Sequence, residues 1–268
     1  MMNEESVLRA LRGLPLSAVR YFDTLDSTND EALRWLGQGA PDSSLVVARA
    51  QTAGRGRAER SWFSQPEASL TFSWILRPQA GELRLGGLFS LYAGVALCLA
   101  FEKSYGLHPQ IKWPNDVLVS GRKVAGILTE SSSVGSTLDG VVTGVGINLT
   151  PAAIPENPSF PATCLQDFVG APPEPEACLA AVLRALVDLR PVLQSGGIPS
   201  MLNERLAFRR VPVFVTDPFH GNGAEGMISG VDEQGRLELN TFGGERVAFE
   251  EGELHLRPAE EEKSANDR

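Results

Sequence analysis

The chain has 268 residues, of which 43% are hydrophobic and 21% charged, and its formal net charge is −9. This length suits one large domain, or a large domain followed by a small one. The acidic balance argues against broad nucleic-acid binding, which usually leaves a basic face on a protein. We therefore expect a soluble globular protein without a nucleic-acid partner.

The cysteines and the chain start indicate the compartment. Cys98, Cys164 and Cys178 have unrelated spacings and form no zinc or redox motif, which favours a reduced cytoplasmic protein. The acidic first residues lack the basic and apolar regions of a signal peptide. The longest uncharged run, residues 85–101, contains several glycines and is read as a buried core helix rather than a membrane helix.

The first predicted elements lead to a basic loop. Residues 4–13 predict a short helix, and Thr28 with Glu31 has the form of a capping box at the start of a second one. From position alone, Ser27, Thr28 and Asn29 either cap that helix or contact a ligand. Residues 45–50 predict a buried strand that leads into the basic loop.

Residues 51–62 (QTAGRGRAERSW) hold three arginines against one glutamate. Gly54 and Gly56 alternate with Arg55 and Arg57, so the backbone can take positive φ there and come close to a ligand. Guanidinium groups are forked donors for phosphate or carboxylate. The loop therefore predicts a site for a small anion.

The middle of the chain predicts strands around that site. Residues 69–76 alternate polar and apolar side chains, as a half-buried strand does, and an apolar helix follows over 84–104. Runs 111–119 and 121–130 flank a turn at Gly121 and predict a hairpin. A further strand over 140–149 ends in a Gly/Asn pattern that permits close backbone approach.

Four polar residues interrupt the apolar strands of this hairpin: Lys112, Asn115, Asp116 and Lys123. A lone buried ammonium is costly unless it is paired or meets an anionic ligand. Two interpretations remain open from this stretch, a surface strand with Lys123 in solvent or a site for an anion.

The last third predicts a loop region, two helices and a small barrel. Residues 151–175 are proline-rich, and 176–194 and 200–207 have helical patterns. After Val211, short strands are separated by turns and suggest a small barrel. Those strands are predicted at 213–216, 225–231, 236–240, 246–249 and 253–257.

Several stretches taken together resemble one family. They are STN at 27–29, QTAGRGR at 51–57, RSW at 60–62, KWPND at 112–116, KVAGIL at 123–128 and GVGIN at 144–148. Each is weak alone, but their order and spacing are very specific. The chain resembles the biotin–protein ligases from Tyr21 to Arg257.

The resemblance implies an α+β fold. Its main part is a mixed, largely antiparallel sheet with helices, related to class II aminoacyl-tRNA synthetases and lipoate ligases, and an SH3-like β-barrel follows. We expect a catalytic domain over 1–208, the barrel over 209–258 and a disordered tail over 259–268. The few residues before Tyr21 are too short for the helix-turn-helix domain of some members, which implies a ligase without DNA-binding function.

The resemblance also implies a two-step reaction. Biotin's carboxylate attacks the α-phosphorus of ATP to give biotinyl-5′-AMP and pyrophosphate, with Mg²⁺ assisting. An acceptor lysine of a biotin carboxyl carrier protein domain then attacks the acyl carbon, and AMP leaves. No protein nucleophile is needed, so His108, His220 and His255 are expected to be incidental.

By family position, Lys123 and Arg57 are the catalytic residues implied. The biotin-binding set is Ser27, Thr28, Asn29, Gln51, Arg55, Gly56, Arg57, Lys123 and Gly126. The nucleotide-binding set is Gly54, Arg57, Arg60, Trp62, Asn115, Lys123, Asn148 and Arg257. Asp116 is the candidate for Mg²⁺.

Two rival functions stay open at this point. One is a lipoate-type acyl-adenylate ligase on the same fold, and the other is a non-catalytic sensor of biotin or nucleotide. The Gly-Arg-Gly-Arg loop and KWPND favour biotin, and retention of Lys123 with both arginines favours an enzyme. Both a monomer and a homodimer fit the sequence.

Overall fold

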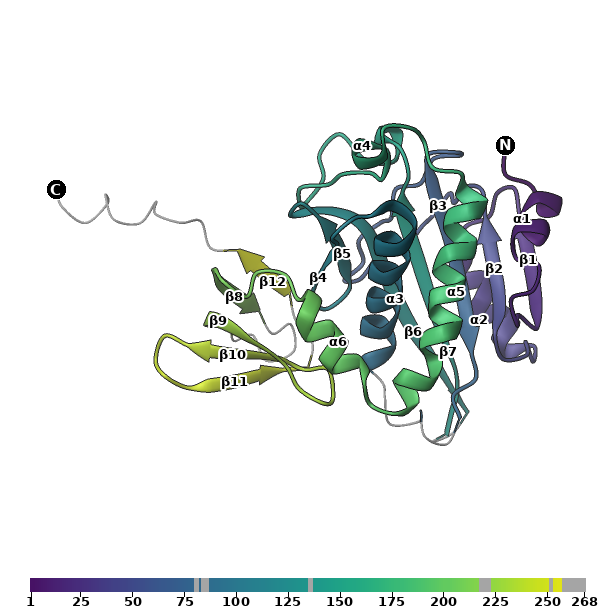
Figure 1. Cartoon of the computed structure of the whole chain (residues 1–268). Coiled ribbons are helices and arrows are strands. Elements are labelled where there is room, and N and C mark those ends of the chain that lie inside the picture. Colours follow the sequence, from purple (N-terminus) through teal and green to yellow (C-terminus); the bar gives the residue numbers. More distant parts are fainter. Residues whose placement is uncertain (80–81, 83–86, 135–136, 217–222, 251–252, 257–268) are drawn as a thin grey trace.

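The protein is represented by a computed structural model that describes residues 1–79, 82, 87–134, 137–216, 223–250 and 253–256. Within these residues, a seven-stranded sheet carries helices and stands beside a smaller five-stranded sheet (Figure 1). The strand order of the larger sheet is β1-β2-β3-β7-β6-β5-β4. Its strands are β1 (Ala18–Phe22), β2 (Ser44–Ala48), β3 (Ser69–Leu76), β4 (Gln110–Lys112), β5 (Asp116–Val119), β6 (Arg122–Val134) and β7 (Thr137–Asn148).

The larger sheet is mixed but largely antiparallel, as predicted. Strands β1 and β2 run parallel, and every other neighbouring pair in the described sheet is antiparallel. Apolar side chains of β3 and β7 meet helix α3 (Leu88–Tyr105) and, beyond it, α5 (Pro175–Gln194) on one face. Helix α2 (Thr28–Gly37) packs on the other face.

Strand β3 is buried on both faces, which corrects the half-buried prediction. Every residue from Ser69 to Leu76 is buried. Phe72 and Trp74 enter the core under α3, whereas Ser73 faces α2 and lies within hydrogen-bonding distance of its first residues. The polar positions that suggested solvent contact in fact meet polar partners inside the protein: Ser73 on α2, Thr71 at the Ala48 carbonyl and Ser69 at the Gln65 N–H.

The apolar run in the middle of the chain forms the predicted core helix. Most residues of α3 are buried, and the helix ends at Gly106, which has a φ of 64°. No helix in the described part of the chain has the length and apolar character to span a bilayer. The two later helices, α5 and α6 (Ile198–Arg205), match the predicted helices closely.

The N-terminal helices begin at polar caps. Helix α1 (Glu4–Ala10) is capped by Asn3, and α2 by Ser27 rather than Thr28. The predicted capping box of Thr28 and Glu31 is therefore wrong. Ser27 has the extended backbone of a cap, so its hydroxyl accepts from the Asp30 N–H, and Thr28 is already helical.

The predicted hairpin over 111–130 forms, with one change. Its second turn lies at Ser120 and Gly121, whose φ values are 50° and 73°. The run 111–119 is two strands, β4 and β5, that fold back on each other around the cis Trp113–Pro114 peptide bond. This fold places Lys112 directly across from Asp116.

All five predicted C-terminal strands form one antiparallel sheet in the order β11-β10-β9-β8-β12. The indole of Trp113 donates a hydrogen bond to the carbonyl of Gly235 at 3.1 Å and links this sheet to the first part of the chain. The strands are β8 (Pro212–Thr216), β9 (Gly223–Val231), β10 (Leu237–Thr241), β11 (Arg246–Phe249) and β12 (Glu253–Leu256). The predicted tail over 259–268 lies outside the described residues.

Candidate active site

A cavity of about 1390 Å³ opens beside the C-terminal end of β7. Its walls come mainly from five stretches: the start of α2, the arginine loop, the β4–β6 hairpin, the end of β7 and the proline-rich region. That last region contains two short helices, η1 (Pro151–Ala153) and α4 (Gln166–Val169). The motifs of the family resemblance thus surround one space.

The arginine loop, residues 54–62, is a small hairpin. The Trp62 N–H donates to the Gly54 carbonyl at 2.8 Å, and Arg55 and Ser61 form an isolated antiparallel β-bridge. The freedom to take positive φ is not used at Gly54 or Gly56, and the loop's positive φ values fall on Ala58 (51°) and Glu59 (57°) instead.

A glycine is needed at position 54 because neighbouring groups pack closely against its Cα, and not because of its backbone angle. A Cβ on Gly54 would lie 2.6 Å from the Trp62 carbonyl oxygen and 2.8 Å from Gln51 Nε2. Any larger residue would therefore push the loop away from Gln51. The glycine fixes how closely the loop approaches the cavity.

The indole of Trp62 lies on a glycine floor. Gly126 and Gly146 are cross-strand partners on β6 and β7, and a Cβ on either would collide with the Trp62 ring. Lys123 Nζ is 5.5 Å from the centre of the same ring. The predicted close approach near the end of β7 is confirmed, and it serves a side chain of the protein itself.

Lys123 faces the cavity and is paired. Its Nζ lies 2.7 Å from Asp116 Oδ1, and the side chains are 26% and 12% exposed. A register shift between Val117 and Leu118 marks a bulge at this point of the β5–β6 ladder, a feature that redirects nearby side chains. The interpretation with Lys123 in solvent is therefore wrong.

Lys112 is a second cavity lysine. Its Nζ lies 4.3 Å from the centre of the Phe160 ring, which belongs to the proline-rich region. Burial lowers the pKa of Lys112 from its ordinary value, while Asp116 acts in the opposite direction. The cavity thus concentrates positive charge in a partly dry place.

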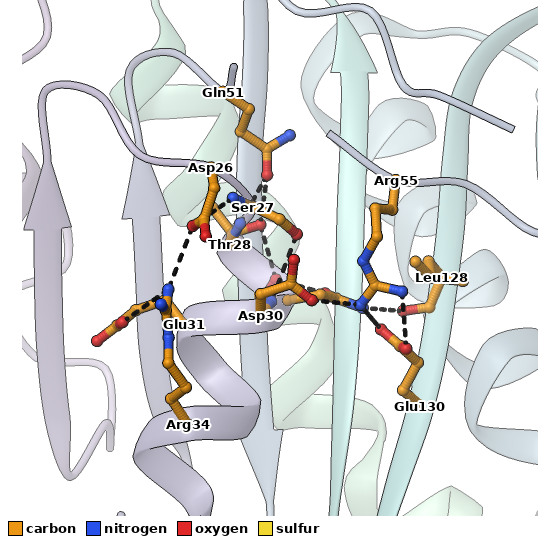
Figure 2. A network of polar contacts seen from close by, with 12 residues as sticks. Asp26, Ser27, Thr28, Asp30, Glu31, Arg34, Gln51, Arg55, Leu128 and Glu130 are labelled. Atoms are coloured by element: carbon orange, nitrogen blue, oxygen red, sulfur yellow. Dashed lines mark hydrogen bonds and ion pairs between the residues drawn. The ribbon is translucent and has the colours of Figure 1, made fainter. Parts of the chain in front are cut away.

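The residues predicted for biotin meet around Gln51. Gln51 Oε1 accepts from the Thr28 N–H at 2.7 Å and from the Thr28 hydroxyl at 3.0 Å. The side-chain nitrogen of Gln51 points away from these contacts (Figure 2). Ser27 and Thr28 are buried, so the start of α2 forms a rigid wall of the cavity.

Asn29 is engaged by the protein. Its Nδ2 donates to the Leu128 carbonyl at 3.1 Å and to Glu130 Oε2 at 2.8 Å. Its Oδ1, which can only accept, takes the Ser73 hydroxyl at 2.6 Å. A Cβ on Gly144 would overlap the Asn29 amide, so the glycine makes room for this buried contact.

Arg55 is held by two carboxylates (Figure 2). Its Nη2 lies 2.6 Å from Asp30 Oδ1 and 2.6 Å from Glu130 Oε2, and its Nη1 lies 3.0 Å from Glu130 Oε1. These hydrogen bonds to Glu130 are the largest cause of a raised pKa of Arg55. The guanidinium predicted to meet an external anion is thus met by two internal ones.

The predicted nucleotide residues fall into two groups. Asn115 Nδ2 donates to the Ile127 carbonyl and Asn148 Nδ2 to the Thr163 carbonyl, so both amides brace backbone at the cavity wall. Of the remaining described members, Arg57, Arg60, Trp62 and Lys123 line the cavity, whereas Gly54 lies behind them at the base of the loop and is not among the lining residues. Arg257 lies outside the described residues.

Sequence reasoning gave no role to Phe160, Glu130, Asp30 or Ser73. Phe160 sits in a stretch without periodicity, and the other three take their meaning from partners far away in the chain. Asp30 directly follows the STN motif, and Glu130 ends the predicted strand 121–130. Their position next to these motifs was the sequence signal that could have identified them.

The described residues hold no group of three or more His, Cys, Asp and Glu side chains able to bind a metal. The three cysteines are reduced and buried, and burial raises the pKa of Cys178 to about 12. At neutral pH this thiol is protonated, so it is a poor nucleophile.

Comparison with known proteins agrees with the motifs. The model of the Biotin/lipoate A/B protein ligase family matches residues 21–148. The biotin–[acetyl-CoA-carboxylase] ligase of Paracoccus denitrificans is 36% identical over 228 residues, which cover 83% of this chain and 94% of that protein. The bifunctional ligase/repressor BirA of Bacillus subtilis is 40% identical over 152 residues, and that match spans 46% of its length and 56% of this chain.

A solved structure shares the architecture. The biotin protein ligase from Aquifex aeolicus, in complex with biotin and ATP, superposes with a TM-score of 0.76 at 26% identity. The match covers 91% of this chain and all of that one. The extended identity to the Paracoccus ligase, the ordered motifs and the common fold agree, and the chain belongs to the biotin–protein ligase family of enzymes.

Proposed function

We propose that this chain forms biotinyl-5′-AMP from biotin and ATP, releases pyrophosphate, and transfers biotin to a lysine of a biotin carboxyl carrier protein domain. The observation that carries the proposal is the convergence of Lys123, the arginine loop and the Gln51–Thr28 contact on one cavity. The extended likeness to a biotin–[acetyl-CoA-carboxylase] ligase supports the choice of acid and acceptor.

In the first step two anions must come together, the biotin carboxylate and the α-phosphate of ATP. Lys123 contacts both and stabilises the charge that develops at phosphorus. Asp116 Oδ1, 2.7 Å from Lys123 Nζ, holds the ammonium in place at the cavity wall. Lys112 adds to the positive potential from the same wall.

The biotin pocket uses the start of α2 and the loop. Gln51, oriented by Thr28, presents its amide nitrogen to the ureido oxygen, and Ser27 offers a hydroxyl. Asn29, Gly56, Arg57 and Gly126 complete the biotin set, and Arg55 belongs to it by holding the loop in place through Asp30 and Glu130 instead of by meeting the biotin carboxylate. The Trp62 ring on its glycine floor gives the pocket a flat apolar surface.

The nucleotide occupies the side of the cavity that Arg57, Arg60 and Trp62 line. Gly54, Asn115, Lys123 and Asn148 complete this set, and Arg257 is proposed to reach it from the C-terminal sheet. Arg57 covers the adenylate and slows its escape. Cation–π and stacking contacts suit the adenine base in such a place.

Asp116 would hold a Mg²⁺ ion that arrives with ATP. A single carboxylate together with substrate phosphates is a common way to bind this ion, and the Asp116 side chain is at the cavity wall. When bound, the ion neutralises phosphate charge. Asp116 would then serve both the ion and Lys123, whose Nζ lies 2.7 Å from its Oδ1.

In the second step the ε-amine of the acceptor lysine attacks the acyl carbon, and AMP leaves. Adenylation has already activated the carboxylate, so no side chain of this chain forms a bond to biotin. We propose that residues 1–208 form the catalytic domain and that 209–258 form a separate small domain, which contributes Arg257 to the nucleotide site. The active unit is proposed to be a monomer or a homodimer.

The test is ATP–pyrophosphate exchange that depends on added biotin. Exchange with biotin but not with lipoate supports the proposal, and exchange with lipoate alone would favour the lipoate-type ligase. Binding of biotin or ATP without any exchange would indicate a non-catalytic sensor. Transfer is followed separately, with a carrier domain as acceptor.

A further inference from the structure

The arginine loop divides into a root and a tip. The root consists of residues 54–56 and 60–62, which pair across the hairpin: Gly56 N–H to the Arg60 carbonyl at 2.6 Å, and Trp62 N–H to the Gly54 carbonyl. The tip consists of residues 57–59, in which Ala58 and Glu59 have left-handed backbone. The tip carries Arg57, and the root carries Arg55.

Charge at the root argues against an external anion there. One guanidinium, that of Arg55, faces the two carboxylates of Asp30 and Glu130, so the local sum is negative. A biotin carboxylate or a phosphate placed at Arg55 would meet both carboxylates at close range. Arg55 therefore has a different task from Arg57.

The acceptor side of this contact is anchored in the core. Glu130 takes a hydrogen bond from Asn29, which is 3% exposed, and Asn29 is fixed in turn by Ser73, which is 0% exposed. An exposed ion pair usually contributes little because two long side chains must be ordered. Here one partner is already ordered, and the contact is bidentate.

We propose that Glu130 and Asp30 are positioning residues that clamp Arg55, and with it the root of the arginine loop, so that the tip alone moves when ligands bind. This inference rests on the proposed function of the same site. Asn29 then acts through Glu130 by holding its carboxylate, and Gly144 acts by leaving space for Asn29.

The first experiment needs no activity. Trypsin is applied to the ligand-free wild type and to Glu130→Gln, and cleavage after Arg55 is followed by mass spectrometry. We expect cleavage after Arg55 to become about tenfold faster in the variant, because local opening controls the rate. Glu31→Gln is the matched control: Glu31 follows Asp30 on α2 but pairs with Arg20 and Arg34 instead of Arg55.

The second experiment uses biotin-dependent exchange and the appearance of free biotinyl-AMP. We expect Glu130→Gln to raise KM for biotin and the adenylate escape rate each about tenfold, with kcat within about twofold, because the loop is displaced while Lys123 is not. Loss of kcat together with Tm would indicate a merely structural role and overturn the proposal.

The double variant Arg55→Gln/Glu130→Gln decides whether the two residues act as one clamp. We expect its KM for biotin to be about tenfold above that of the wild type, as in either single variant. The second substitution removes the partner of a contact that is already lost. If the two effects multiply to raise KM about a hundredfold, Arg55 meets the ligand directly and the proposal is overturned.

Two further arms keep the outcomes distinct. Should Glu130→Gln fail to fold, Asp30→Asn tests the more exposed half of the clamp, with about threefold faster cleavage after Arg55 expected; an unchanged rate overturns the proposal. A wild type without biotin-dependent exchange would refute the proposed function alone, and the trypsin result would still decide whether the root is clamped.

Discussion

Both ends of the larger sheet carry arginine–carboxylate clusters, and they are built differently. At the cavity end Arg55 and Lys123 meet their carboxylates at the border of open space. At the other end Arg190, 13% exposed, lies 2.6 Å from Asp42 and 3.0 Å from Glu82, which is 0% exposed.

The two clusters differ in whether their positive charge remains available to a ligand. The distal cluster closes on itself: Arg190 also donates to the carbonyl of Arg77, whose guanidinium bonds Asp139. Such a cluster can only hold loops together. The cavity cluster has lysines beside a large space, where positive charge remains available to an anionic ligand. Substitutions at the two ends should therefore separate catalysis from stability.

The largest expected effect is on chemistry at the cavity end. Lys123→Ala should reduce biotin-dependent exchange about 100-fold or more, since one charge contact made in the transition state is worth about 3 kcal/mol. The initial exchange rate at saturating biotin measures it. Arg122→Ala, the exposed neighbour 3.9 Å from Asp167, is the control and should keep the rate. A Lys123→Ala rate within about threefold of wild type would refute the assignment.

At the distal end the largest effect should be on stability. Arg190→Met leaves the Glu82 carboxylate buried without its main partner, and should lower the free energy of unfolding by about 3 kcal/mol. Urea unfolding measures this, and KM for biotin should not change. Arg184→Met, at an exposed position of the same helix, should be nearly neutral. Equal midpoints for the two variants would contradict the comparison.

Two glycines on β7 show the same contrast between ligand binding at the cavity and stability in the core, with a smaller expected effect. A Cβ on Gly146 would overlap the Trp62 indole in the cavity, whereas one on Gly140 would lie 2.6 Å from the side chain of Leu36 in the core. Gly146→Ala should raise KM for biotin about tenfold, and Gly140→Ala should instead cost about 1–3 kcal/mol of stability. Steady-state kinetics and thermal unfolding of both variants check this, and a rise in KM for Gly140→Ala would break the separation.

The smallest expected effect is a pH dependence at the distal end. Burial opposes ionisation of Glu82, but hydrogen bonds from Arg190 and the Gln79 N–H outweigh it, so its pKa is lowered from 4.5. A carboxyl group whose pKa is lowered by folding stabilises the fold at pH values above its pKa in the unfolded chain. That contribution is lost as the pH falls through its pKa in the folded protein. The free energy of unfolding of the wild type should exceed that of Glu82→Gln by about 1 kcal/mol at pH 7, and this difference should narrow below pH 4.5. A gap that is constant with pH in urea unfolding would contradict this sign.

The sequence predicted most elements because their patterns are local. The five C-terminal strands, the core helix and the β5–β6 hairpin follow from periodicity and turn residues. The errors occurred where a distant covering element changed the meaning of a pattern. Ser73 alternates as if it faced water, but α2 covers it, and Thr28 resembles a cap, but the adjacent Ser27 takes that role.

By itself the sequence determined the family, the mixed sheet with its small companion and the motif residues around the cavity, because motif order and hydrophobic period are properties of the chain. The tertiary structure alone decided how those residues are used. It paired Arg55 with Glu130, 75 positions away, anchored that pair through Asn29, and fixed Lys123 on Asp116. Charge balance at a site depends on distances through space, and residue order does not contain those distances.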